Sequence, residues 1–382
     1  MRPLSDTLAR LAAMKARAAA PPSRSGPSRL VPFRLSGSDP GHLDAKVFIP
    51  SRPARDAALV VVLHGCTQTA DGYDHGSGWS TLAEEQGFFL LFPEQQRANN
   101  PNLCFNWFLP EHTQRGRGEA ASIRGMIEAM SRAHAIDPRS VFITGLSAGG
   151  AMAATMLATY PEVFAGGAII AGLAHGVAQS VPEAFDRMRG HALPSQSLLQ
   201  GGLRSASSHG GPWPTISIWQ GTADNTVHAS NADAIVDQWL EVHALERSLS
   251  ARRTLGSRTT SEWSGRDGEV KITQHRIDGM GHGAPLASTG PAAYGNPGPY
   301  MLDVGIGSTH EIAEDWGLTG NVVRARPAEQ PTGTVSGDEY VRSDAMPEPA
   351  HVGERASAGV DAAPGKVGEI IEAALRSAGL MK

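Results

Sequence analysis

The sequence ITGLSAGGAM at residues 143–152 places one serine, Ser147, between two glycines, Gly145 and Gly149. A short run of apolar and β-branched residues precedes this serine, and an alanine-rich, helix-forming run follows it. A G-x-S-x-G sequence between a strand and a helix is typical of a nucleophile elbow, the sharp turn that exposes a reactive serine hydroxyl. Glycines suit this turn because a Cβ at either position would collide with the neighbouring strand and helix. The alternative is an ordinary turn whose serine caps the helix.

A reactive serine needs a general base, because a free hydroxyl is a weak nucleophile at neutral pH. In a parallel sheet covered by helices, functional groups gather beyond the carboxyl ends of the strands. Asp224 follows the predicted strand TISIWQG, and His282 lies in the glycine-rich loop after VKITQHRI. The chain order serine, acid, histidine is that of the α/β hydrolases. We therefore expect Ser147, Asp224 and His282 to form a catalytic triad for acyl transfer.

Other acids and histidines fit the triad less well. His275 lies inside the predicted strand at 270–277 rather than beyond its end. Asp233 and Asp237 fall on the predicted helix after Asp224, and Asp278 is too close to His282 in sequence. These residues are expected to have structural roles.

An acyl-transfer site also needs N–H groups that stabilise the negative oxygen of the tetrahedral intermediate. The hydrolase fold takes one from the residue after the nucleophile, here Ala148, and one from the loop after an earlier strand. The strand ALVVVLH at 58–64 ends in a turn, which makes the Cys66 N–H the second candidate. His64 is expected to brace this turn rather than to act as a base.

The composition favours one large catalytic domain over other classes of protein. The chain has 382 residues, of which 41% are hydrophobic and 19% are charged, enough for a sizeable core. A formal charge of −5 without a concentrated run of lysine or arginine argues against nucleic acid as a partner. The sequence shows neither a transmembrane stretch nor a zinc or calcium motif. We expect a reaction that needs no metal and no other cofactor.

Predicted strands and helices alternate along the chain, which indicates an α/β class protein. The fold class expected is an α/β-hydrolase fold, with a mostly parallel, doubly wound sheet and a short cap-like insertion. The last strand is expected at 270–277. The expected divisions are an N-terminal helix and linker at 1–29, the catalytic domain at 30–319 with its insertion at 173–214, a disordered linker at 320–364 and an amphipathic C-terminal helix at 365–382.

Several motifs in order resemble one family across residues 30–318. They are VVLHGCTQTADGY, LFPEQQRANNPNLCFNWF, GLSAGGAMAA with TYPEVFAGGAIIAGL, and WQGTADNTV followed by GMGHG. The chain resembles the poly(3-hydroxyalkanoate) depolymerase-type esterases, and among them the intracellular short-chain poly(3-hydroxybutyrate) depolymerases. The resemblance implies a serine esterase that cleaves such polyesters through an acyl-enzyme, and it supports Ser147, Asp224, His282 and the Cys66 N–H in their expected roles.

The same resemblance implies two further features of the site. Trp107, in CFNWF, would form a wall of the substrate crevice. The loops that carry Cys66 and Cys104 would lie side by side, as in secreted relatives, and a disulfide could join them. The alternative is two buried free thiols, which is the usual state of cysteines in the cytoplasm.

Location and substrate form follow from the ends of the sequence. Charged residues interrupt the apolar stretches of the N-terminus, so no secretory signal is expected and the cytoplasm is the predicted location. The segment after residue 320 is too short for a typical substrate-binding domain, which favours amorphous poly(3-hydroxybutyrate) or its oligomers over crystalline polymer. A polyhydroxyalkanoate granule is then a candidate partner for the C-terminal helix.

Two other functions remain open at this point. One is a carbohydrate esterase of the feruloyl or acetyl-xylan type, since similar catalytic domains serve those esters. The other, from a different class, is a non-catalytic protein that uses the fold to bind granules.

Overall fold

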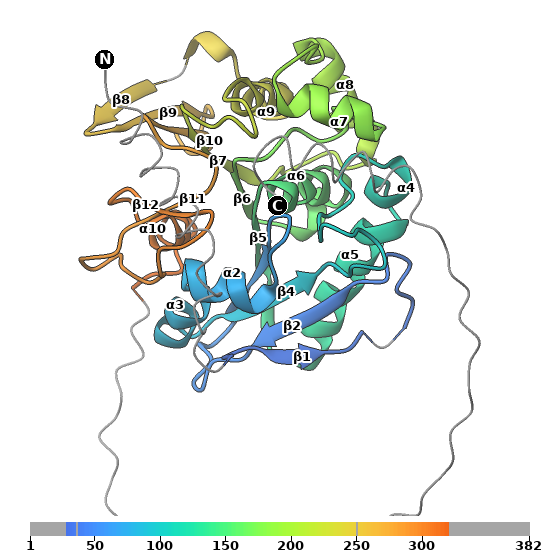
Figure 1. Cartoon of the computed structure of the whole chain (residues 1–382), viewed down its shortest axis with the longest axis vertical. Helices are drawn as coiled ribbons and strands as arrows, with labels where there is room; N and C mark the ends of the chain where they lie inside the picture. Colours follow the sequence, from blue (N-terminus) through green and yellow to red (C-terminus); the bar gives the residue numbers. More distant parts are fainter. Residues whose placement is uncertain (1–27, 36, 250, 321–382) are drawn as a thin grey trace, which may run out of the picture.

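A ten-stranded sheet runs through the protein (Figure 1). The computed structural model describes residues 28–35, 37–249 and 251–320. The central strands, in the order β4-β3-β5-β6-β7-β10, are parallel, and antiparallel strands extend the two edges as β1-β2 and β9-β8. The strands of this sheet are β1 Val31–Phe33, β2 Asp44–Phe48, β3 Ala57–Leu63, β4 Phe89–Glu94, β5 Ile136–Leu146, β6 Gly166–Ile170, β7 Thr215–Gly221, β8 Ala251–Leu255, β9 Arg258–Ser264 and β10 Val270–Ile277.

Strand β3 is apolar along its whole length. Successive side chains of a strand point to opposite faces of the sheet. Leu59, Val61 and Leu63 enter the core on one face, whereas Val60 and Val62 enter the core on the other. All five are 0% exposed, because both faces are covered. The mostly parallel, doubly wound sheet predicted from the sequence is confirmed.

Helices cover both faces of the sheet (Figure 1). Helices α2, α3 and α10 contribute to the core on the face of Val60 and Val62, and α5, α6, α8 and α9 contribute to the opposite core. The helices are α2 Ala70–Ser77, α3 Trp79–Gln86, α4 Pro110–Thr113, α5 Gly118–Ala133, α6 Ala148–Thr159, α7 Val181–Met188, α8 Gln196–Ala206, α9 Ser230–Leu240 and α10 Ser308–Asp315, with short 3-10 helices at Pro161–Val163 and Arg247–Leu249.

The segment 173–214, predicted as a cap-like insertion, contains helices α7 and α8. Helix α8 packs against α9, and its Leu199 and Leu203 are buried in the core. Helix α7 brings Phe185 and Met188 to a cavity that also contains Ser147. The insertion therefore forms one wall over the carboxyl end of the sheet.

The structure corrects the prediction that 270–277 is the last strand. After β10, strands β11 Ala284–Leu286 and β12 Met301–Asp303 pair in a separate two-stranded sheet. These strands have three residues each, too few to show a periodic pattern. The hairpin of β8 and β9 was also not predicted, because edge strand β8 is exposed along its whole length and carries no apolar alternation.

Three predicted segments fall almost entirely outside the described residues. They are the N-terminal helix and linker at 1–29, the linker at 320–364 and the C-terminal helix at 365–382, and all three stay predictions. In the ranges given above, no helix is both long and apolar enough to cross a membrane.

Candidate active site

Ser147 connects the end of β5 to the first turn of α6. Its backbone has φ 58° and ψ −118°, a conformation that a residue with a Cβ rarely adopts. The Ser147 N–H donates to the carbonyl of Ile170 at 2.9 Å, which fixes the turn to β6. The serine side chain makes no capping hydrogen bond to α6. This geometry is that of a strained nucleophile elbow rather than of an ordinary capped turn.

The two glycines of the motif are required by close backbone contacts. A Cβ at Gly145 would lie 2.3 Å from the carbonyl oxygen of Gly149. A Cβ at Gly149 would lie 2.4 Å from the carbonyl oxygens of both Leu63 and His64. Both contacts are far below van der Waals separation, and their partners are backbone atoms that cannot move aside. The small residues therefore allow strand β3, the turn and helix α6 to approach closely.

His282 lies in the loop between β10 and β11 and connects Ser147 to Asp224. Its Nε2 is 2.9 Å from Oγ of Ser147, and its Nδ1 is 2.7 Å from Oδ2 of Asp224. The Asp224 side chain is fully buried, whereas that of His282 is 9% exposed. Because a carboxylate can only accept, Nδ1 carries the proton of a neutral His282 and Nε2 is free to accept the serine proton.

Asp224 is held by the loop that follows β7. Its Oδ1 accepts the backbone N–H groups of Thr226 and Val227, both at 2.8 Å. Its Oδ2 accepts the side-chain amide of Gln220 at 3.1 Å in addition to the His282 ring. These bonds fix the carboxylate so that one oxygen faces the histidine.

Two backbone N–H groups lie beside Ser147 without an acceptor. Cys66 follows the end of β3, Ala148 begins α6, and both residues line the cavity that contains Ser147. Within the described part of the chain, neither N–H donates a hydrogen bond to another group. Free N–H groups next to a nucleophile can bind an oxygen that gains negative charge.

The loops after β3 and β4 are joined next to these groups. A disulfide connects Cys66 to Cys104, 38 residues further along the chain. The N–H of Thr67 donates to the carbonyl of Asn102 at 2.7 Å, which adds a second link. Trp107 lies on the same β4 loop, is 6% exposed and lines the cavity. The structure thus brings every residue of the expected site to one end of the sheet.

Ser147 lies between two cavities of different character. The first has a volume of about 50 Å³ and an almost entirely apolar wall, which includes Trp107, Phe108, Leu173, Val181, Phe185 and Val227. The second has a volume of about 30 Å³ and is lined by Gln68, Thr226, His282 and Tyr300 among others. Met188 borders both. The α7 and Tyr300 side chains were not predicted, because they lie in segments without a functional motif.

None of the acids and histidines set aside from the sequence lines either of these two cavities. The His275 ring stacks on Trp219 with 3.8 Å between centroids. Asp233 forms ion pairs with Arg247 and Arg276, Asp237 pairs with Arg247, and Asp278 accepts a bond from Thr222. Each of them has a structural partner.

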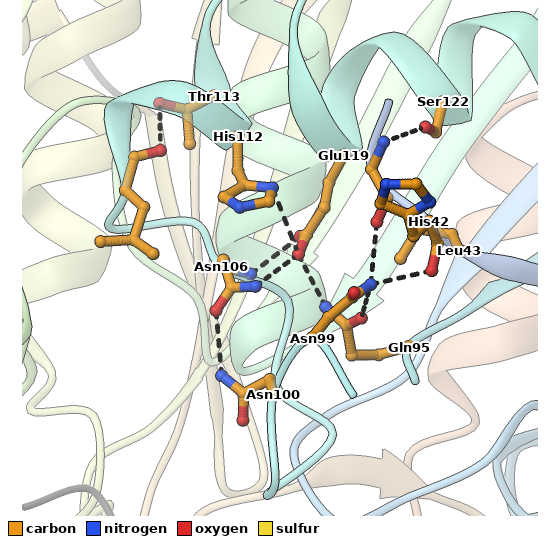
Figure 2. A network of polar contacts seen from close by, with 12 residues as sticks. His42, Leu43, Gln95, Asn99, Asn100, Asn106, His112, Thr113, Glu119 and Ser122 are labelled. Carbon is orange, nitrogen blue, oxygen red and sulfur yellow. Dashed lines mark hydrogen bonds and ion pairs between the residues drawn. The ribbon is translucent and has the colours of Figure 1, made fainter. Parts of the chain in front are cut away.

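A buried polar network beneath the site was not predicted. Gln95, Asn106 and Glu119 lie at its centre (Figure 2). The only signal in the sequence is the run of amides in PEQQRANNPN. Among the described residues, no group of three or more histidine, cysteine, aspartate or glutamate side chains could hold a metal ion.

Comparison with known proteins agrees with this geometry. Residues 43–262 match the family described as Esterase PHB depolymerase. The chain belongs to this family. This esterase is 40% identical over 289 residues to poly(3-hydroxyalkanoate) depolymerase C of Paucimonas lemoignei, an alignment that covers 74% of this chain and 69% of that protein. It is therefore a carboxylic ester hydrolase.

Other relatives of this esterase are named for different ester substrates. It is 30% identical over 258 residues to feruloyl esterase B of Neurospora crassa, with 65% of this chain and 86% of that protein covered. An acetyl xylan esterase from Aspergillus awamori superposes with a TM-score of 0.64 at 23% identity, over 77% of this chain and 100% of that chain. This superposition supports the α/β-hydrolase fold.

Proposed function

We propose that this esterase cleaves short-chain poly(3-hydroxyalkanoates), as amorphous poly(3-hydroxybutyrate) or its oligomers, and that Ser147, His282 and Asp224 are its catalytic triad. The observation that carries the triad is the continuous line of hydrogen bonds from Asp224 through His282 to Oγ of Ser147. Such a line activates a serine without a cofactor.

The reaction proceeds in two acyl-transfer steps. Oγ of Ser147 attacks the ester carbonyl carbon while its proton passes to Nε2 of His282. The resulting oxyanion accepts hydrogen bonds from the N–H groups of Cys66 and Ala148. His282 then gives its proton to the departing alkoxide, which leaves as the hydroxyl end of the shortened polymer. In the second step His282 takes a proton from water, and the hydroxide attacks the acyl carbon. His282 then gives this proton to Oγ of Ser147 as the carboxylic acid leaves.

The apolar cavity supports a short alkanoyl group as the acyl part. Its volume of about 50 Å³ is several times the roughly 10–15 Å³ that holds a single water, which suits an acyl chain of a few carbons. A feruloyl group contains an aromatic ring and is larger than such an acyl chain, so the cavity favours the smaller group. The 40% identity to a protein named poly(3-hydroxyalkanoate) depolymerase C points to the same class of substrate.

Acetylated xylan is the second candidate substrate. It is favoured by the similarity to feruloyl and acetyl xylan esterases, and an acetyl group is small enough for the apolar cavity. A purely non-catalytic granule-binding role is disfavoured, because such a role would not require the aligned serine, histidine and aspartate.

The cellular location stays a prediction. Disulfides persist in oxidising compartments and are rare in the cytoplasm, so the Cys66–Cys104 bridge favours an oxidising compartment over the predicted cytoplasm. Granule association through the helix at 365–382 concerns residues outside the described ranges and also stays a prediction.

The deciding experiment compares substrates with the purified protein. Amorphous poly(3-hydroxybutyrate), feruloyl esters and acetylated xylan are each incubated with the enzyme, and the products are identified by mass spectrometry. Release of 3-hydroxybutyrate or its oligomers supports the proposal. Preferential release of acetate from xylan would contradict it and would make acetylated xylan the substrate. p-Nitrophenyl butyrate serves as a general test, since a binding protein would leave this ester intact.

A further inference from the structure

Glu119 is a fully buried carboxyl that the proposed reaction does not use. It lies in the first turn of α5 with 0% of its surface exposed. Its Oε1 accepts the side-chain amides of Gln95 and Asn106, both at 2.7 Å, and its Oε2 accepts the Asn106 N–H at 2.8 Å (Figure 2). No lysine or arginine within the described ranges pairs with it, and its nearest basic atom is Nδ1 of His112 at 3.7 Å.

Such a group is costly for the fold. Burial raises the pKa of Glu119 to about 7, and a carboxyl without a cationic partner contributes less to stability than an apolar side chain of the same size. We therefore expect the role of Glu119 to be the positioning of the groups to which it is hydrogen-bonded, Gln95 and Asn106.

Gln95 connects Glu119 to both loops that border the nucleophile. Its side-chain amide donates to Glu119 and also to the carbonyl of Cys104 at 3.0 Å. Its side-chain oxygen accepts from Asn99 at 3.0 Å. Its backbone N–H donates to Nε2 of His64 at 3.1 Å, in the loop that follows β3. Gln95 thus contacts both the loop after β4, which carries Cys104, and the loop after β3, which carries Cys66.

His64 passes this constraint to the peptide group that carries the Cys66 N–H. Because Nε2 accepts the Gln95 N–H, the neutral His64 ring carries its proton on Nδ1. Nδ1 is 2.8 Å from the carbonyl oxygen of Gly65 and donates to it. The Gly65 carbonyl and the Cys66 N–H belong to the same planar trans peptide and point in opposite directions. Fixing the direction of the carbonyl therefore fixes the direction of the Cys66 N–H, in a residue that lines the same cavities as Ser147.

The disulfide supplies a second path to the same residue. Glu119 and Gln95 hold Asn106 and the Cys104 carbonyl, and the sulfur of Cys104 is bonded to that of Cys66. Two paths from the buried carboxyl thus meet at Cys66, one through its peptide plane and one through its side chain, and Gln95 takes part in both.

We infer that Glu119 and Gln95 are positioning residues for the oxyanion-binding N–H of Cys66, acting through His64 and Cys104. The inference rests on the proposed catalytic roles of Ser147 and Cys66. It implies an effect on the transition state, in which the oxyanion forms, and little effect on the binding of the ester substrate.

The test uses Glu119→Met, which removes every acceptor, and Glu119→Gln, which retains one side-chain oxygen. The matched control is Glu128→Gln on the same helix, where the side chain is 47% exposed. For each variant, kcat and KM are measured with p-nitrophenyl butyrate, and Ki is measured for a trifluoromethyl ketone, whose adduct with serine places an oxyanion in the same position. Circular dichroism establishes that each variant is folded.

Loss of one oxyanion donor costs about 100- to 1,000-fold in kcat, so a displaced donor should cost somewhat less. We expect kcat to fall about 100-fold in Glu119→Met and about 10-fold in Glu119→Gln, with KM within about 2-fold of wild type and Ki weakened in parallel with kcat. Glu128→Gln should match wild type in all three.

Two results would overturn the inference. One is a folded Glu119→Gln with wild-type kcat and Ki, which decides the matter even if Glu119→Met does not fold. The other is a rise in KM with kcat unchanged, which would mean that the network only supports the cavity wall. Ser147→Ala separates this inference from the proposed function. If Ser147→Ala is inactive while the Glu119 variants behave as wild type, only the present inference fails, whereas an active Ser147→Ala contradicts the proposed function itself.

Discussion

Nε2 of His282 lies 2.9 Å from Oγ of Ser147, although 135 residues separate them along the chain. The distance is that of a hydrogen bond along which a proton can move during nucleophilic attack. Both side chains are held by other elements, Ser147 by the turn between β5 and α6 and His282 by its bond to Asp224. The pair is therefore aligned before a substrate arrives.

Replacement of the proposed nucleophile should separate activity from stability. Ser147→Ala removes the attacking atom but keeps a Cβ at the same backbone angles, so the strain of the turn is unchanged. We expect kcat for p-nitrophenyl butyrate to fall by roughly four orders of magnitude or more, while the free energy of unfolding stays within about 1 kcal/mol of wild type. Turnover at the wild-type rate would refute the assignment of Ser147.

The two candidate histidines should differ sharply. His282→Ala removes the proposed base, and Asp224→Asn removes the acceptor that selects its tautomer, a change that costs about 10⁴ in kcat in a comparable triad. His275→Ala removes a ring stacked on Trp219, so it should lower the thermal midpoint and leave kcat within a few fold. A folded but inactive His275→Ala would show that the base has been assigned to the wrong histidine.

The order of strands explains why much of the site could be predicted from the sequence. Parallel strands have their carboxyl ends at one edge, so residues that follow predicted strands, such as Ser147 and Asp224, are expected to lie together. The glycine spacing around Ser147 adds a local signal, because those positions are close backbone contacts. Their catalytic role remains a proposal.

Glu119 shows why the rest could not be predicted. An acid in the first turn of a helix is ordinarily an exposed complement to the helix dipole, and nothing in the sequence around Glu119 distinguishes it from that case. Its burial depends on how the loop after β4 folds over α5, and that loop has no periodic pattern. The edge strands β8 and β9 were missed for a similar reason, since pairing rather than sequence pattern defines them.

The Cys66–Cys104 bridge should stabilise the protein and support catalysis. Closing a loop of 38 residues contributes about 4 kcal/mol in the chain-entropy account. We expect Cys104→Ser to lower the free energy of unfolding in urea by about 2–4 kcal/mol. It should also lower kcat, because Cys66 carries a proposed oxyanion donor.

The control for the bridge is the double variant Cys66→Ser, Cys104→Ser. Dithiothreitol should lower the unfolding midpoint of the wild type to near that of the double variant and leave the double variant unaffected. Thiol titration establishes that reduction is complete. A fully reduced wild type with an unchanged midpoint would contradict a stabilising role.

Burial strongly lowers the pKa values of four histidines and strongly raises those of two carboxyls, and the two effects act on stability in opposite directions. It lowers the pKa values of His64, His175 and His243 to about 4 and that of His275 to about 3. Since an unfolded histidine titrates near pH 6.5, the unfolded chain takes up protons below this pH that the folded chain does not. These histidines stabilise the fold fully above about pH 6.5 and lose that contribution as the pH falls toward 4. The raised pKa of Glu119, about 7, favours the fold at low pH and loses its effect as the pH rises from about 4.5 to 7.

The four histidines should outweigh Glu119 and Asp315, whose pKa values burial raises to about 7 and about 6, so stability should fall below neutral pH. Each histidine is expected to cost about 2 kcal/mol between pH 7.5 and 5. His275→Phe retains a ring to stack on Trp219 but cannot titrate. Between pH 7.5 and 5, the decrease in its free energy of unfolding should therefore be about 2 kcal/mol smaller than that of the wild type. The exposed His191, changed to Phe, is the control. If the free energies of unfolding of wild type and His275→Phe, measured in urea, fall by the same amount between pH 7.5 and 5, the explanation is excluded.

The apolar cavity next to Ser147 should set the length of the acyl group. Ala184 on α7 is 5% exposed and lines this cavity together with Phe185. A cavity of about 50 Å³ loses much of its space when a side chain of four carbons replaces a methyl group. An added methylene in a filled apolar pocket changes relative rates by roughly 10- to 200-fold.

Ala184→Leu should therefore shorten the acyl chain that the enzyme accepts. We expect kcat/KM for p-nitrophenyl butyrate to fall at least about 10-fold relative to p-nitrophenyl acetate, because only the longer acyl group needs the lost space. Phe185→Ala enlarges the cavity and should raise the relative rate with the octanoate ester. Asp186→Leu adds a similar side chain at an exposed position of the same helix and should leave the ratios unchanged, since it does not line the cavity. If Ala184→Leu lowers the acetate and butyrate rates equally in a folded protein, the cavity does not hold the acyl group, and the leaving alcohol becomes the part of the substrate that lies there.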